Sequence, residues 1–157
     1  MTVRLNEQDI ITLIHEPKPL PEDYQDLLKL KQKRGHKIAD LDIDGINGSK
    51  FRIMLRQSNE DQFDFSAILG YYIPGTNVLF RLCRYNGRSH EHTNKIEKDK
   101  FFDYHKHLAT ERYQHSGLNE DEYAEIINRY SDLHGALQCL ITECNFILPI
   151  NSQLPML

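Results

Sequence analysis

The sequence predicts a single α+β domain: N-terminal helices, an antiparallel meander of four to five strands, then a long C-terminal helix packed on the sheet. Two observations predict this fold class. Short stretches in the middle of the chain alternate apolar and polar side chains between turn-forming clusters, which is typical of a meander. The two ends of the chain instead follow the 3.6-residue period of helices. Strands grouped together, with helices before and after them, indicate an α+β architecture.

The N-terminal residues predict two short helices. Asn6 and Asp9 precede a cluster of apolar residues that ends before Pro17, as expected for a capped helix. Pro21 suits the first turn of a second helix, which should end near Gly35. We divide the chain into an N-terminal helical extension (residues 1–20), a core (21–145) and a tail (146–157).

The predicted strands occupy residues 38–43, 51–56, 63–69, 78–83 and 101–109. Turns are expected at residues 44–48, 58–62 and 74–77, where Gly, Asn, Asp, Ser and Pro accumulate. The segment 87–100 is polar and has no clear period. The sequence therefore predicts a long loop between the fourth and fifth strands.

The C-terminal third predicts the covering helix. Asn119 and Glu122 resemble a capping box. One helical face then collects the apolar side chains Tyr123, Ile126, Ile127, Tyr130, Leu133, Leu137, Leu140, Ile141 and Cys144. We expect one helix, or two with a kink near Gly135.

Composition restricts the environment of the chain. The 157 residues can form a substantial core, and no apolar run approaches the roughly 20 residues that cross a membrane. The start lacks a basic segment followed by an apolar one, so we expect no secretory signal. Three cysteines without Cys-x-x-Cys spacing favour reduced thiols. The expected location is cytoplasmic, without membrane contact.

Charge is unevenly distributed. The net charge is −4, but residues 81–115 carry eight Lys or Arg and five Asp or Glu, a local charge of +3. A locally basic segment on an acidic body suits a site for phosphate or another anion, whereas a protein that coats nucleic acid non-specifically needs a wide basic face. Chance variation in surface charge is the alternative explanation.

The same segment contains four of the eight histidines, as the His-x-His pairs His90/His92 and His105/His107. On an extended strand, His105 and His107 point to one face, about 6.6 Å apart. Imidazole exchanges protons near neutral pH and also binds metals. We therefore place the candidate site here.

Three interpretations of the cluster remain open. It could perform metal-free phosphodiester chemistry, in which histidines handle the protons and guanidinium groups hold the phosphate. It could bind a divalent metal through His105, His107 and one of His90, His92 or Glu97. It could also be an inert, hydrogen-bonded network that fixes a long loop to the sheet.

The motifs in this segment resemble known families. The segments RYNG (84–87), HTNxIE (92–97) and HxHxATERYQ (105–114) resemble an uncharacterised bacterial domain family, over about residues 24–145. This resemblance implies a bacterial or mobile-element origin and no particular activity. A more distant similarity is to TumE-type toxins of toxin–antitoxin systems, through Arg84-Tyr85-Asn86 and His105-Lys106-His107. Asn86 replaces the aspartate of that pattern, the loop is longer, and Tyr104-His105 replaces a doubled histidine.

The resemblance implies an RNA- or nucleotide-directed toxin, possible ribonuclease chemistry and a cognate antitoxin as partner. In that interpretation His105 and His107 act as base and acid. The expected catalytic residues are His105, His107, Arg84, Arg112, Tyr85 and Glu111, and the expected substrate-binding residues are His90, His92, Asn86, Asn94 and Glu97. We expect no cofactor, with one divalent metal at His105/His107 as the alternative. A competing hypothesis is a non-catalytic mobile-element protein that inhibits a host protein, its acidic body mimicking nucleic acid.

Overall fold

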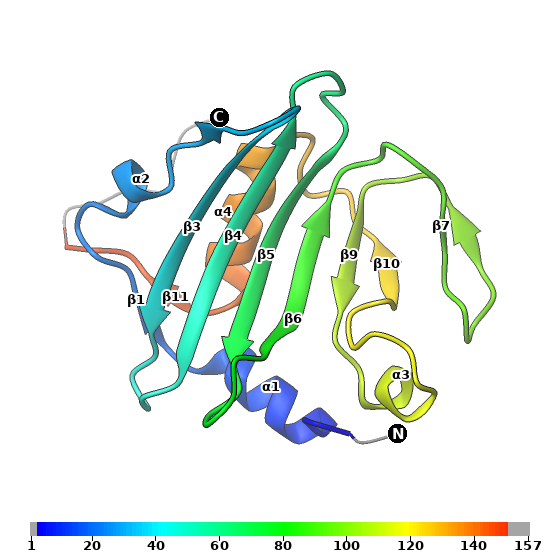
Figure 1. Cartoon of the computed structure of the whole chain (residues 1–157), viewed down its shortest axis with the longest axis horizontal. Helices are drawn as coiled ribbons and strands as arrows, with labels where there is room; N and C mark the ends of the chain where they lie inside the picture. The colour runs from blue at the N-terminus through cyan, green and yellow to red at the C-terminus, as the bar shows by residue number, and fades with distance from the viewer. Residues whose placement is uncertain (1–2, 151–157) are drawn as a thin grey trace.

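The computed structural model describes residues 3–150 and is built around a seven-stranded antiparallel sheet (Figure 1). The strand order is β10-β9-β6-β5-β4-β3-β2. The strands are β2 (Lys31–Gln32), β3 (His36–Asp44), β4 (Lys50–Ser58), β5 (Phe65–Tyr72), β6 (Leu79–Asn86), β9 (His105–Leu108) and β10 (Ala124–Ile126). The sheet forms because β3 to β6 pair with their sequence neighbours through short turns, as alternating strands do. The α+β class is therefore confirmed.

Helices and two small strand pairs surround this sheet. The helices in residues 3–150 are α1 (Glu7–His15), α2 (Tyr24–Leu27), α3 (Glu111–His115) and α4 (Leu133–Glu143). Strand β1 (Lys18–Pro19) pairs in parallel with β11 (Phe146–Ile147), and β7 (His92–Thr93) pairs with β8 (Lys100–Phe101) as a hairpin beside β9. None of these helices is long and apolar enough to cross a membrane.

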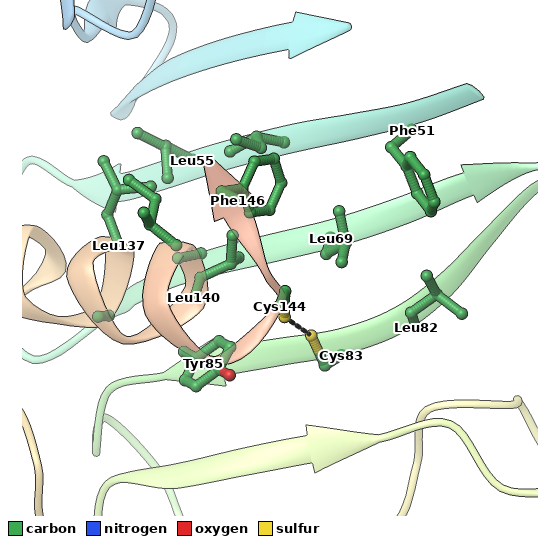
Figure 2. Close-up of a cluster of buried hydrophobic side chains, with 14 of the residues drawn as sticks. Phe51, Leu55, Leu69, Leu82, Cys83, Tyr85, Leu137, Leu140, Cys144 and Phe146 are labelled. Atoms are coloured by element: carbon green, nitrogen blue, oxygen red, sulfur yellow. Dashed lines mark hydrogen bonds between the residues drawn. The ribbon is translucent and has the colours of Figure 1, made fainter. Parts of the chain in front are cut away.

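The core lies between α4 and one face of the sheet, which we call the covered face (Figure 2). Leu140 on α4 is fully buried, as are Leu69 and Tyr85 on the strands below it. Helix α1 contributes Ile10 and β11 contributes Phe146 to the same cluster. The segments expected to be an extension and a tail thus supply buried side chains to one core. The other side of the sheet is the open face.

Most predicted elements are present. Helix α1 begins after Asn6, whose side chain accepts from the Asp9 backbone N–H, and it ends before Pro17. The four strands of the meander are confirmed with shifts of a few residues at their ends. The fifth, predicted at 101–109, is β9, and its alternation places His105 and His107 on one face as expected.

Two predicted helices are wrong in extent. The second one shortens to the four residues of α2, since the chain then pairs with β3 as β2. The long C-terminal helix begins only at Leu133, where Asp132 provides the cap by accepting from the Gly135 N–H. Before it, β10 satisfies its backbone groups on the edge of β9, so a periodic apolar pattern does not become a helix. Residues 151–157 of the predicted tail lie outside the described part of the chain.

Candidate functional site

The register of two strands builds the base of the site. Strands β6 and β9 pair so that Arg84 lies opposite His107 and Asn86 lies opposite His105. Because directly opposed residues of paired strands project to the same side, these four side chains share the open face. Tyr85, between Arg84 and Asn86, projects to the covered face beneath α4 (Figure 2).

A third histidine reaches this face from the β7–β8 hairpin. The ring centroids of His105 and His107 are 4.9 Å apart. The His92 ring lies 4.9 Å from His107 and 5.2 Å from His105. One ring nitrogen from each histidine lies within 4.8 Å of the others. Three imidazoles from segments that are distant in sequence therefore converge on one point, and we call them the histidine triad.

Hydrogen bonds fix which nitrogen each triad ring presents. His105 Nδ1 donates to the Asp103 carbonyl at 2.9 Å, and His107 Nδ1 donates to the Asp121 carbonyl at 2.7 Å. A carbonyl oxygen only accepts, so both rings carry the proton on Nδ1 and a lone pair on Nε2. The Nε2 atom of His105 is buried and has no partner within residues 3–150.

Asn94 fixes which ring nitrogen His92 presents. Its side-chain amide donates to the Ala124 carbonyl at 2.8 Å, and its oxygen accepts from the Ala124 N–H at 2.9 Å. The amide orientation is thus set, and the same oxygen accepts from His92 Nε2 at 2.8 Å. His92 therefore presents the lone pair of Nδ1.

Burial keeps two of the rings neutral. The side chains of His105 and His107 are almost completely buried. Burial lowers the pKa of His105 to about 4, opposed by its bond to the Asp103 carbonyl. Burial, with the positive charge of Arg84 next, lowers the pKa of His107 to about 2. At neutral pH both imidazoles are therefore uncharged, each with one N–H and one free lone pair, which is the state that binds metals.

The triad fits a divalent transition metal. Neutral imidazoles suit Zn²⁺, and also Fe, Ni or Cu ions, and three protein ligands are the number found at catalytic zinc. Metal-bound histidines typically donate their second N–H to a carbonyl or carboxylate group, as His105 and His107 do here. We therefore identify His92, His105 and His107 as the residues that could hold a metal.

Several predicted site residues lie elsewhere. Tyr85 donates to the Glu143 carboxylate at 2.8 Å on the covered face. Glu111 accepts from the Glu7 backbone N–H at 3.0 Å, near the start of α1. Arg112 donates through Nε to Glu97 at 2.9 Å, and Glu97 also accepts from Tyr113. The contacts of Glu97 with Arg112 and Tyr113 connect the β7–β8 hairpin to α3. These hydrogen bonds lead away from the triad.

The remaining predicted residues lie at or near the triad. His90 is exposed, and its ring centroid lies 6.4 Å from that of His105. Asn86 shares the open face, where its side-chain oxygen accepts from Ser66 at 2.8 Å. Asn94 and Arg84 adjoin His92 and His107, as described above. The structure thus brings together part of the predicted set around three histidines.

Sequence reasoning missed Asp121 and also Arg81, whose Nε lies 3.2 Å from the Asp121 carboxylate. Asp121 falls inside the predicted C-terminal helix, and no motif marks it. In the structure it lies between α3 and β10, where its carbonyl orients His107. Nothing in the local sequence indicates this contact, because it depends on the pairing of β10 with β9.

Comparisons with known proteins leave the site to be interpreted from its geometry. No protein-family model matches the chain, and neither the curated proteins nor the solved structures include a significant match.

Proposed function

We propose that the protein binds one divalent transition metal at His92, His105 and His107 and hydrolyses phosphate esters there. The convergence of three imidazoles with fixed tautomers carries this proposal. Each ring uses one nitrogen in a hydrogen bond to a main-chain carbonyl or to Asn94, which leaves the other for a ligand. An inert network would instead use both nitrogens of a buried ring, and His105 Nε2 has no such partner among residues 3–150.

The protonation states favour a metal over metal-free acid–base chemistry. A general acid must hold its proton near neutral pH, and an effective catalytic pKa lies close to that pH. The lowered pKa values of His105 and His107 remove this capacity. A divalent metal held by three histidines lowers the pKa of bound water to about 7 and so supplies a nucleophile.

Arg84 supports an anionic substrate. It projects from the open face opposite His107, and its side chain makes no hydrogen bond to another group in residues 3–150. One guanidinium group can bind a phosphate in a bidentate manner, with two N–H groups donating to two of its oxygens. We propose RNA or nucleotides as the substrate class and a TumE-like toxin, acting in the cytoplasm of a bacterium, as the biological setting. This setting rests on the motif resemblance.

Metal content tests the first half of the proposal. Wild-type protein is purified without chelator and assayed by elemental analysis beside His105→Ala/His107→Ala and His134→Ala. His134 is exposed on α4, so it serves as a matched histidine control. We expect about one equivalent of metal in the wild type and the control, and loss in the double variant. Less than about a tenth of an equivalent in wild-type protein, after reloading with Zn²⁺, would overturn the metal centre.

Activity tests the second half. The three proteins are incubated with a labelled RNA oligonucleotide and with a nucleoside monophosphate, and each is expressed from a tightly regulated promoter in bacteria. We expect RNA cleavage and growth arrest from the wild type and the control alone. Metal binding without cleavage or arrest would contradict the nuclease and leave the metal centre intact. A stable complex with a host protein in that case would favour the inhibitor hypothesis.

A further inference from the structure

We propose that Arg84 and Arg81 form a phosphate-binding subsite beside the histidine triad, in which the Asp121 carboxylate is the resident counter-ion that a substrate phosphate displaces. This inference rests on the proposed function for its position next to a metal. The phosphate group of the substrate is then the part that the protein recognises, and the Asp121 carboxylate competes with it.

The first observation is a set of unsatisfied polar atoms. Within residues 3–150, the buried side-chain nitrogen and oxygen atoms without a hydrogen-bond partner are Arg81 Nε, Arg84 Nε, His105 Nε2 and Asp121 Oδ2. Buried polar groups in folded proteins are nearly always paired, and each exception requires an explanation. All four of these atoms belong to the triad or to residues beside it, which indicates one ligand site.

The second observation is the poor geometry of the internal ion pairs. Asp121 is 1% exposed, and its Oδ2 lies 3.2 Å from Arg81 Nε and 3.4 Å from Arg84 Nε without forming a hydrogen bond to either. Burial raises the pKa of Asp121, and the two arginines oppose this effect. The two arginines hold Asp121 Oδ2 by charge without a hydrogen bond, so a better ligand can take its place beside them.

The other arginines of the open face provide a contrast. Arg52 donates to Asp42 at 2.8 Å, and Arg56 donates to Asp64 at 2.8 Å. Arg81 has a partial second partner, because its Nε lies 3.8 Å from Glu120. Arg84 is ion-paired with Asp121 alone among the described residues, and its side chain is 27% exposed. Arg84 therefore shares its one charged partner in the described chain with Arg81, and its side chain is partly exposed to solvent.

The subsite is connected to the triad through two residues. The Asp121 carbonyl accepts from His107 Nδ1, and Arg84 lies opposite His107 across the strand pair. An anion on Arg84 therefore lies next to the ring that the triad presents to a metal. Phosphate suits this position, since its several oxygens can contact a guanidinium and a metal at the same time.

The test measures phosphate binding by calorimetry at constant ionic strength, with and without Zn²⁺. Inorganic phosphate, adenosine monophosphate and a short RNA are titrated into wild type, Arg84→Gln, Asp121→Asn and Arg56→Gln. Arg56→Gln is the matched control, because Arg56 shares the open face and has its own carboxylate. Comparison of the three ligands shows whether the group recognised is free phosphate, a monoester or a diester.

We expect Arg84→Gln to weaken phosphate binding about tenfold, which corresponds to one lost charge-assisted hydrogen bond. We expect Asp121→Asn to strengthen it about tenfold by removing the competing charge. Arg56→Gln should bind as the wild type does. Weaker binding by Asp121→Asn, or equal binding by Arg84→Gln, would overturn the subsite. If Arg84→Gln does not fold, Asp121→Asn decides the question alone.

The two proposals fail in different ways. Binding of phosphate by chelator-treated protein, with the expected response to Asp121→Asn, would support the subsite even if no metal binds. Stoichiometric metal with no phosphate binding would overturn the subsite and retain the metal centre.

Discussion

The polar groups on the two faces of the β6–β9 strand pair differ in how completely they are hydrogen-bonded. On the covered face, Glu143 accepts from Tyr85 at 2.8 Å, from Lys106 at 3.0 Å and from Arg129 at 2.9 Å. On the open face, His105 Nε2 and Arg84 Nε are buried without a partner in the described chain. Neighbouring residues of the same strands thus form a hydrogen-bonded network around Glu143 on one side, and on the other side they leave two buried nitrogens without a hydrogen bond. Paired groups stabilise the fold, and the buried nitrogens without a hydrogen bond are the atoms that we propose to bind a ligand.

The largest expected effect is a loss of stability in a variant of the covered face that keeps its metal affinity. Leu140 is completely buried on α4 against the covered face, so Leu140→Ala should lower the free energy of unfolding by about 2–5 kcal/mol. The affinity of the folded molecules for Zn²⁺ should not change. Chemical denaturation and calorimetry measure the two quantities. A large loss of metal affinity in this variant would show that the two faces are coupled.

The next effect concerns the open face alone. His107→Ala removes one of three ligands, and we expect Zn²⁺ affinity to fall by at least about a hundredfold, above the range for residues that only orient a ligand. The exposed His134→Ala serves as the control. Calorimetric titration measures both variants. Equal affinities of the two variants would contradict the assignment of the triad.

The lowered histidine pKa values predict a pH effect in chelator-treated protein. In the unfolded chain both rings titrate near their ordinary pKa of about 6.5. Between about pH 6.5 and 4, the unfolded state therefore binds more protons at His105 and His107 than the folded state does. Their contribution to stability is complete above about pH 6.5 and decreases as the pH falls, by up to about 1.4 kcal/mol per unit for each ring. Below about pH 4 only His107 continues this loss.

Urea unfolding at pH 7 and pH 5 checks this effect against His105→Gln/His107→Gln. The wild type should lose more stability between these pH values than the double variant. Parallel losses in the two proteins would show that the two rings have the same pKa in the folded protein as in the unfolded chain.

A smaller effect tests the orientation of His92. Asn94 holds His92 Nε2 and both backbone groups of Ala124, so Asn94→Ala should weaken Zn²⁺ binding about tenfold. Asn59→Ala, in an exposed turn, is the control. Calorimetry at fixed pH measures both. An unchanged affinity would mean that the hairpin holds His92 without this contact.

The smallest effect concerns Arg112, which the sequence predicts to hold phosphate. In the structure it pairs with Glu97 at the surface, and exposed pairs contribute no more than about 1 kcal/mol. We expect Arg112→Ala to leave phosphate affinity unchanged and to alter stability slightly. A tenfold loss of phosphate affinity would restore the sequence-based assignment.

Local sequence patterns specify the α+β class, the meander and the segment that carries the histidine triad. Alternating residues specify strands, and the alternation of β9 alone places His105 and His107 on one face. These are local properties, since each depends on a few consecutive residues. The capped helix α1 is predictable for the same reason.

Tertiary structure alone decided which residues join the triad. Tyr85 differs from Arg84 by one position, yet it faces α4, because successive residues of a strand point to opposite sides. His92 reaches His107 through the path of a polar hairpin, and Asp121 reaches it because β10 pairs with the edge of β9. Edge pairing also overrode the helical period of residues 123–130, since free backbone groups on β9 satisfied those of β10. Such contacts join residues far apart in the chain, and no local pattern specifies them.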